Sequence, residues 1–380
     1  MIKKPRLIKL LQKVISYNSE NPPGNELALA KFIAKDMRSL GLDVKLYSFA
    51  KNRPNIIATL KGTLPRAKAQ KEALLITPHI DTVPAGKGWK FDPLGGQISG
   101  GKIYGRGTSD DKGNLAACME VMRSLVEDKI KLRKDVIMAA TVDEETGSHY
   151  GIKPLLDKKI LRPKIALVLD SDDCDAIVAQ KGLMHIRIEL FGKKAHGAYN
   201  WKGVNAIEIA AKIITALKEM KFEYKNHPLL RPPTVNIGTI KGGDKVNMVA
   251  DFCEVAVDFR YLPGMNPQNI LRDVKSVIKK HNKKFKIIID DLQFPYEISS
   301  KHPAVEAFVH TARKNGFIGK LKGSEGATVI TFFQKHKIPA FASGFSASGT
   351  AHSTDEFISI NTFYKGTKVL EAFIKEYDKK

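Results

Sequence analysis

Five histidine and acidic side chains of this 380-residue chain are candidates to bind divalent metal ions. They are His79, Asp110, Glu145, Asp170 and His352. Imidazole and carboxylate groups together suit zinc or a related ion such as cobalt or manganese. Two such ions about 3.5–4 Å apart can activate a water molecule and polarise a carbonyl group at once. The set therefore predicts a centre with two divalent metal ions, zinc being the expected metal.

The glycine-rich segment 105–113 organises this set. Its sequence, GRGTSDDKG, predicts a tight loop that presents Asp110 at the start of a helix, because residues 114–126 have the apolar spacing of a buried helix. An acid at such a place often only caps the helix. The other acid and histidine clusters favour a metal role instead, in which Asp110 bridges the two ions. The pairs that complete the two sites are then His79 with Asp170 and His352 with Glu145.

Two apolar runs deliver further members of the set. Residues 73–77 predict a buried strand, and His79 follows it at the carboxyl end, where ligands gather in open α/β sheets. Asp81 is two residues further on, so we expect its carboxylate to orient the His79 ring. The run 165–169 ends in Asp170 in the same way. Asp172 or Asp173 could take the role of that ligand instead.

The apolar run 135–140 leads into three consecutive acids, Asp143, Glu144 and Glu145. Adjacent carboxylates repel one another unless a positive charge lies among them, and a metal ion supplies that charge. With Glu145 as a ligand, Glu144 is free to act as the general base that takes a proton from water and passes it to a leaving nitrogen.

The length of the chain and the pattern of its apolar residues predict two domains. The length and the 43% of hydrophobic residues are enough for more than one core. Segments 1–178 and 293–380 predict an α/β catalytic domain with a mostly parallel sheet flanked by helices. Alternating runs such as 184–190 and 252–259 predict antiparallel strands with one solvated face, so residues 179–292 are expected to form an inserted α+β domain.

Charge and cysteine content exclude some functions and favour a compartment. Lysine and arginine exceed the acids by 22, yet the lysines are spread along the chain without a nucleic-acid-binding motif. We therefore expect a solvated basic surface and no nucleic-acid partner. Neither a signal peptide nor a membrane span is predicted. The three cysteines are few, odd in number and far apart, which favours reduced core residues and a cytoplasmic protein.

Taken in order, these motifs resemble those of the co-catalytic zinc aminoacylase and exopeptidase family, which includes acetylornithine deacetylase, succinyl-diaminopimelate desuccinylase, aminoacylase and glutamate carboxypeptidase. The resemblance runs from Ser19-x-Asn-Pro-Pro-Gly to Glu356, almost the whole chain. The motifs are His79-x-Asp, the segment 105–113, Asp143-Glu-Glu-x-Gly-Ser, Gly192-Lys-x-Ala-His and Ala351-His-Ser-x-Asp-Glu.

The resemblance implies a zinc-exopeptidase-like catalytic domain and an inserted lid and dimerisation domain. It implies the five metal ligands given above, Glu144 as general base, Asp81 as the residue that orients His79, and a cis peptide after Asp110. It further implies that His196 of one subunit stabilises the oxyanion in its neighbour's active site, which requires a homodimer. The implied substrate contacts are Arg260, Asn247 and the loop from Gly344 through Ser346 to Gly349.

The expected reaction is hydrolysis of the amide of an N-acyl amino acid or short peptide with a free carboxylate. At position 170 this chain has Asp, as the resemblance implies for the peptidase branch, where deacetylases and desuccinylases usually have Glu. The motifs Ser19–Gly24 and Val257–Arg260 are instead similar to those of the deacylase branch. A dipeptidase or carboxypeptidase is therefore the competing enzyme class. The sequence also leaves open an inactive relative that binds amino-acid derivatives, a loop role for His196, and an ion pair of Arg260 within the inserted domain.

Overall fold

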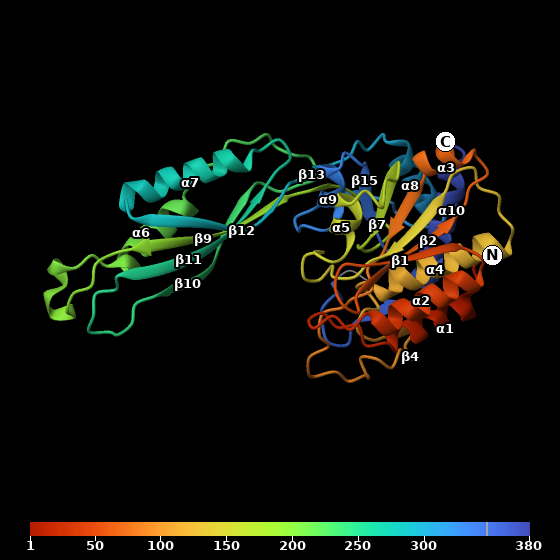
Figure 1. Cartoon of the computed structure of the whole chain (residues 1–380), viewed down its shortest axis with the longest axis horizontal. Coiled ribbons are helices and arrows are strands. Elements are labelled where there is room, and N and C mark those ends of the chain that lie inside the picture. The colour runs from red at the N-terminus through yellow and green to blue at the C-terminus, as the bar shows by residue number, and fades with distance from the viewer. Residues whose placement is uncertain (347–348) are drawn as a thin grey trace. The chain divides into compact units, whose positions relative to one another are not determined.

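A computed structural model describes residues 1–346 and 349–380 of the chain, which divides into two compact units (Figure 1). The first unit comprises Met1–Val178, Ile298–Lys322 and Thr328–Lys380. The second comprises Ala179–Glu297 and Gly323–Ala327. No helix among the described residues is both long and apolar enough to cross a membrane.

The larger sheet is mixed, and most of its strands belong to the first unit. Parallel pairing joins β6, β3, β7 and β15, and antiparallel pairing attaches the strands on either side. The α/β prediction is confirmed, with parallel strands confined to the middle of the sheet. In spatial order the strands are β1 (Asp43–Ser48), β2 (Pro54–Leu60), β6 (Val136–Ala140), β3 (Leu74–Thr77), β7 (Ile165–Leu169), β15 (Ala340–Ser343), β8 (Ala176–Gln180) and β13 (Tyr296–Glu297), and β14 (Leu321–Ser324) pairs with β8.

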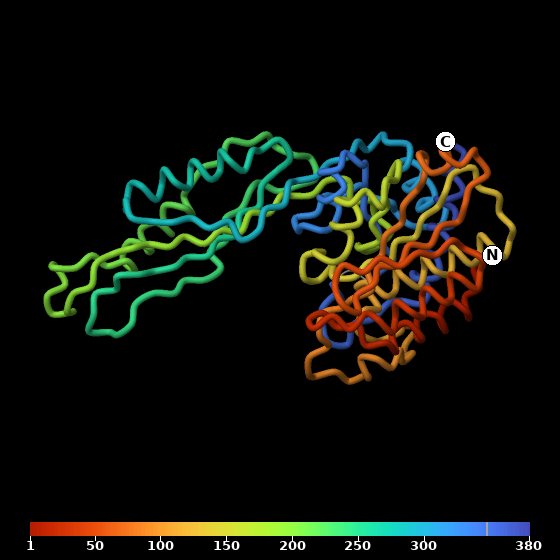
Figure 2. Tube along the Cα trace, viewed as in Figure 1, coloured from red at the N-terminus to blue at the C-terminus, as the bar shows by residue number. Residues whose placement is uncertain are grey.

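Helices cover this sheet because its central strands are apolar on both faces, β3 and β7 being buried at every position. The central helix α4 (Lys112–Glu127) is buried along nearly its whole length and contacts α1, α2 and α10. The chain path can be followed in Figure 2. The other helices are α1 (Lys4–Ile15), α2 (Leu27–Ser39), α3 (Arg66–Lys71), α5 (Ile152–Asp157), α8 (Pro303–Lys314), α9 (Ile330–Lys335) and α10 (Ile360–Asp378).

A small antiparallel sheet in the first unit joins distant parts of the sequence. Its strands are β16 (Phe357–Ser359), β5 (Lys102–Tyr104) and β4 (Gln97–Ser99). The pairing of β16 with β5 brings the C-terminal motif beside the glycine-rich segment, and the Gly105 amide donates to the Glu356 carbonyl at 2.9 Å.

The second unit is an antiparallel sheet with two helices. Alternate residues of β9 and β11 are buried, and these pack with α6 and α7 into a core that includes Ile186, Val255 and Phe259. This is the α+β arrangement expected from the alternating runs. The elements are β10 (Thr234–Gly242), β11 (Phe252–Tyr261), β9 (Gly182–Phe191), β12 (Phe285–Gln293), α6 (Ala206–Lys218), α7 (Pro267–His281) and a 3-10 segment, η1 (Gly197–Lys202).

The cysteines Cys118, Cys174 and Cys253 are all free and buried, as the sequence predicts.

Candidate metal centre

The carboxyl ends of neighbouring parallel strands bring the predicted ligands together. Strands β6, β3 and β7 are adjacent, and they are followed by Glu145, His79 and Asp170. Pairing continues past the ends of β3 and β6, since the Ile80 amide donates to the Thr141 carbonyl at 2.8 Å. The loops that carry the acids and histidines therefore start from one edge of the sheet.

Asp110 lies between two histidines. Its Oδ1 is 2.8 Å from His79 Nε2, and its Oδ2 is 3.1 Å from His352 Nε2. His352 Nε2 is also 3.2 Å from Glu145 Oε1. Single ligand atoms of His79, Asp110 and Glu145 all lie within 4.8 Å of one another. Each oxygen of one carboxylate thus faces a different imidazole, which is the arrangement a bridging ligand needs.

The electrostatics of this cluster fit divalent cations. Burial, followed by the charge of Asp170, raises the pKa of Glu144 well above its usual range. Burial and the neighbouring Asp110 raise the pKa of Asp170 to about 7. So many buried carboxyl groups destabilise one another's ionised forms, and a cation among them removes that cost. Imidazole nitrogens and carboxylate oxygens are also the ligands that zinc takes.

Three acids could be the ligand that follows β7, and among them Asp170 interacts with the charges of the cluster. Its pKa responds to Asp110, His79 and Glu145. Asp172 lies 3.9 Å from Lys322, and the pKa of Asp173 is raised by burial and by Asp172 rather than by the cluster. These charge interactions favour Asp170 over Asp172 and Asp173 as the candidate.

Asp81 holds the acidic turn as well as the histidine. The His79 Nδ1 atom is 3.1 Å from the Asp81 carbonyl oxygen and 3.5 Å from its carboxylate, so the main chain makes the shorter contact. The Asp81 carboxylate accepts the amides of Glu144 and Glu145 at 3.1 and 3.2 Å. It thereby fixes both the proposed base and a proposed ligand.

A buried hydrogen-bond network behind Asp81 was missed by the sequence analysis. Asn21 Nδ2 donates to Asp81 Oδ2 at 2.8 Å and lies 3.3 Å from Asp143 Oδ1. Arg53 Nη1 is 3.0 Å from that same Asp143 oxygen, and its guanidinium also pairs with Glu26. The side chains of Glu26 and Asp143 are almost completely buried. The only signal in the sequence was the place of Asn21 in the Ser-x-Asn-Pro-Pro-Gly motif.

The supporting role of Glu356 was also not predicted, although this residue ends the motif Ala351-His-Ser-x-Asp-Glu. Its carboxylate accepts the amides of Ser109 and Asp110 at 2.7 and 3.0 Å, and Arg106 Nη1 donates to it at 2.6 Å. The residue is fully buried. Glu356 therefore holds the loop that presents Asp110. The peptide between Asp110 and Asp111 is cis, as the resemblance implied.

Asp111 and Asn114 extend this support to the start of α4. The Asp111 carboxylate accepts the His79 amide at 2.9 Å and the Asn114 side-chain amide at 2.6 Å. Burial raises the pKa of Asp111 well above its usual range. Lys112 is fully buried, and its Nζ donates to the Tyr17 carbonyl at 2.7 Å.

The predicted substrate loop is packed into the first unit. A Cβ atom on Gly344 would lie 1.8 Å from the Ser171 carbonyl oxygen, so glycine is required there by close approach of the backbone. The Ser346 hydroxyl is buried and donates to the Ser109 carbonyl. Residues 347 and 348 of the predicted loop lie outside the described residues.

The other predicted contacts belong to the second unit. His196 is exposed, and its Nδ1 accepts the Ala198 amide at 3.1 Å, so Nε2 carries the proton in the neutral ring. The Gly197 amide donates to the Asn247 carbonyl at 2.8 Å, so His196 and Asn247 lie on neighbouring loops. Arg260 pairs with Asp258, its Nε lying 2.9 Å from Oδ1, which is the ion pair within the inserted domain that the sequence left open.

Comparison with known proteins matches residues 75–376 to Peptidase family M20/M25/M40. An acetylornithine deacetylase from Proteus mirabilis is 31% identical over 395 residues, covering 97% of this chain and 96% of that protein. The crystal structure of an aminopeptidase from Bacillus cereus superposes with a TM-score of 0.83 at 26% identity, covering 99% of both chains. A metallo-carboxypeptidase from Sulfolobus solfataricus shares the fold at 22% identity, with a TM-score of 0.81 over 98% of this chain and 99% of that one.

Proposed function

Because this chain belongs to peptidase family M20/M25/M40, and is thus a metal-dependent hydrolase of amide bonds, we propose that it cleaves N-acyl amino acids of the acetyl or succinyl type. The observation that carries the proposal is the position of Asp110, one oxygen beside His79 and the other beside His352. The relative named as a deacetylase, which matches nearly end to end, supports the choice of substrate.

In this proposal two divalent ions, zinc by preference, would be held by residues that share Asp110. His79 and Asp170 would complete one set, and His352 and Glu145 would complete the other. Such ions supply a Lewis acid for the scissile carbonyl and make a water molecule acidic enough to lose a proton near neutral pH.

Glu144 carries the proton in the proposed reaction. Its carboxylate takes the proton as the water oxygen bonds to the carbonyl carbon, and returns it to the amide nitrogen as the C–N bond breaks. Asp81 keeps Glu144 in place through its main-chain amide.

The second unit is proposed to complete the site in a homodimer. His196 would donate to the developing oxyanion of the neighbouring subunit, and Arg260, with Asn247, would bind the substrate carboxylate. Ser346 was the further predicted contact, and its bond to the Ser109 carbonyl supports a role in shaping the loop instead. The three free, buried cysteines support a cytoplasmic location.

A peptidase is the second candidate function. The Bacillus cereus structure, named as an aminopeptidase, is 26% identical over nearly the whole chain. Asp170 also resembles the peptidase branch.

A substrate panel with defined metals tests the choice. Protein stripped with a chelator and reloaded with zinc, cobalt or manganese should hydrolyse N-acetyl and N-succinyl amino acids in proportion to bound metal. Dipeptides and tripeptides are tested in the same assay as the competing class of substrates. Faster cleavage of peptides would replace the deacylase proposal by the second candidate, and full activity in the stripped protein would end both.

A further inference from the structure

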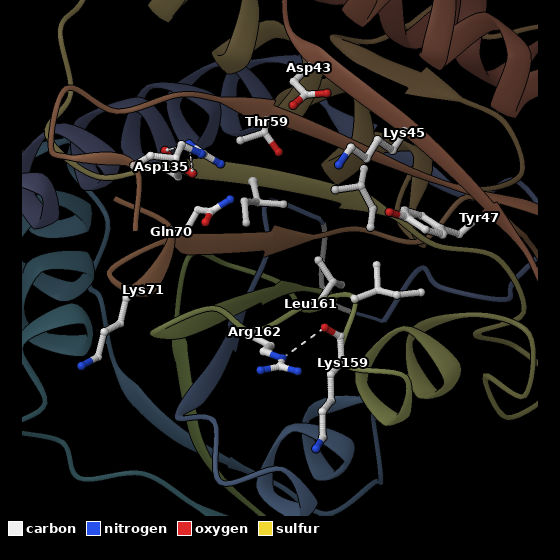
Figure 3. Close-up of a pocket in the computed structure, with 14 residues that line it drawn as sticks. Asp43, Lys45, Tyr47, Thr59, Gln70, Lys71, Asp135, Lys159, Leu161 and Arg162 are labelled. Atoms are coloured by element: carbon white, nitrogen blue, oxygen red, sulfur yellow. Dashed lines mark hydrogen bonds and ion pairs between the residues drawn. The ribbon is translucent and has the colours of Figure 1, made fainter. Parts of the chain in front are cut away.

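A pocket in the first unit lies apart from the metal centre. Its volume is about 440 Å³, within the range of small-molecule sites. Figure 3 shows it against the edge of the central sheet. The residues used below come from β1 (Asp43, Lys45), β2 (Ile57), β6 (Ile137) and the segment after α5 (Leu161, Arg162).

Strand geometry places the pocket away from the reacting groups. Lining residues of β2 are Ile57 and Thr59, while the alternating residues Ile56 and Ala58 do not line the pocket and are completely buried. Successive side chains of a strand point to opposite faces, and α2 packs against β1 and β2, so the pocket opens on the face that α2 does not cover. On β6 it takes Ile137 from the half opposite the end that leads to Glu145.

The charge around the pocket is positive after internal pairing. Of its two acids, Asp135 is buried and paired with Arg66 at 2.7 Å, and Asp43 lies 3.6 Å from Lys61. Four lining cations have no ion-pair partner among residues 1–346 and 349–380. These are Lys45, Lys71, Lys159 and Arg162.

Two of these cations flank an apolar surface. Figure 3 shows the Lys45 amine extending from β1 over the sheet, with Arg162 on the other side of Leu161 in the view. The Arg162 Nε donates to the Lys159 carbonyl at 3.2 Å, which orients the guanidinium while its two terminal nitrogens keep their donors. Ile57 and Leu161, both buried, contribute to the apolar surface.

We propose that this pocket binds a small amphipathic anion, whose acidic group pairs with Arg162 and whose apolar body lies on Ile57, Ile137 and Leu161, with Lys45 adding positive charge from the other side of the pocket. Arginine donors in a fixed plane match the oxygens of a carboxylate, sulfonate or phosphate. Burial of an apolar body against this surface makes the free energy of binding more favourable, and a bare anion lacks that contribution. A purely ionic ligand such as inorganic phosphate is therefore not the preferred occupant.

Naphthalene-2-sulfonate is the probe, because it combines both features and sulfonates are weak metal ligands. Titration calorimetry of the metal-loaded protein at low salt should detect binding. Methanesulfonate, which has only the charge, and 2-naphthol, which has only the apolar body, should each bind at least tenfold more weakly. Equal binding by either of them would overturn the proposal.

Charge-reversal variants test the location. Arg162→Glu with Lys45→Glu should weaken naphthalene-2-sulfonate at least tenfold and leave amide hydrolysis unchanged. Lys31→Glu with Lys35→Glu, two exposed lysines of α2 on the other face, changes the net charge equally and should leave the affinity unchanged. An equal loss of affinity in both double variants would show that the net positive charge of the protein, and not this pocket, attracts the probe, and would overturn the proposal. If the reversed pair misfolds, Arg162→Gln with Lys45→Gln makes the same test.

Discussion

The metal centre of the first unit and the predicted substrate contacts of the second differ in how they are held. His79 and Asp81 are buried, and the loops around them are bonded to residues far away in the sequence. His196 is exposed and makes its side-chain hydrogen bond two residues away, and Arg260 pairs with an acid on its own strand. The side chains of the first region are therefore held by distant segments, whereas the printed side-chain bonds of His196 and Arg260 are to groups two residues away.

The largest effect is expected at the proposed base. Glu144→Gln should reduce kcat about 10²–10⁴-fold, because the amide cannot take a proton from water. Bound metal, measured by atomic emission, should stay unchanged. Glu145→Gln is the matched neighbour and should lower metal content as well as activity. Normal turnover in Glu144→Gln would remove the general base from the mechanism.

The proposed contribution of a neighbouring subunit comes next. His196→Ala should lower kcat about 10²–10³-fold through loss of an oxyanion donor. When it is mixed with Glu144→Gln under conditions of subunit exchange, mixed dimers contain one intact site, and activity should recover to about a quarter of the unmutated value. No recovery would place His196 in its own subunit's site or outside the reaction.

A smaller effect is expected behind the ligands. Asn21→Ala removes the side-chain donor that bonds to Asp81, and such supporting bonds are worth about 10–100-fold in metal affinity or activity. Equilibrium dialysis against zinc measures the affinity. Asn25→Ala, at an exposed position of the same segment, is the control and should bind zinc normally. Equal affinity in both variants would make the Asn21 bond merely structural.

The smallest effect is expected at the second unit's arginine. Arg260→Ala should raise KM about tenfold with kcat little changed. The effect on KM is small because Asp258 already pairs with the guanidinium, which leaves fewer of its donors for the substrate carboxylate. Arg187→Ala removes another arginine of the same sheet, paired with Asp290 at 2.8 Å, and should leave KM unchanged. Identical steady-state constants for both variants would exclude Arg260 from substrate binding.

The sequence predicted the residues that follow buried strands. His79, Glu145 and Asp170 each come after a short apolar run, and parallel strands end at one edge of a sheet, so the sequence alone predicts that these residues lie at the same edge. The α/β class and the alternating strands of the second unit were readable for the same reason, because burial imposes a period on the sequence.

Supporting contacts between loops could not be read in this way. Asn21 reaches Asp81 because its own amide donates to the Thr82 carbonyl at 2.8 Å, a pairing of two loops that no local pattern encodes. The same holds for Glu356 and the amides of Ser109 and Asp110. The Asp81 carboxylate was assigned to the histidine ring, yet the main-chain carbonyl of the same residue is closer.

The bond from the Asp110 amide to Glu356 joins residues 246 positions apart, so the loop that presents Asp110 is fully bonded only when the C-terminal part of the chain is in place. Strands β3, β6 and β7 are synthesised early, but the segment that steadies the bridging carboxylate emerges close to the end of translation. A chain that ends before Glu356 should therefore lack the carboxylate that holds the Asp110 loop.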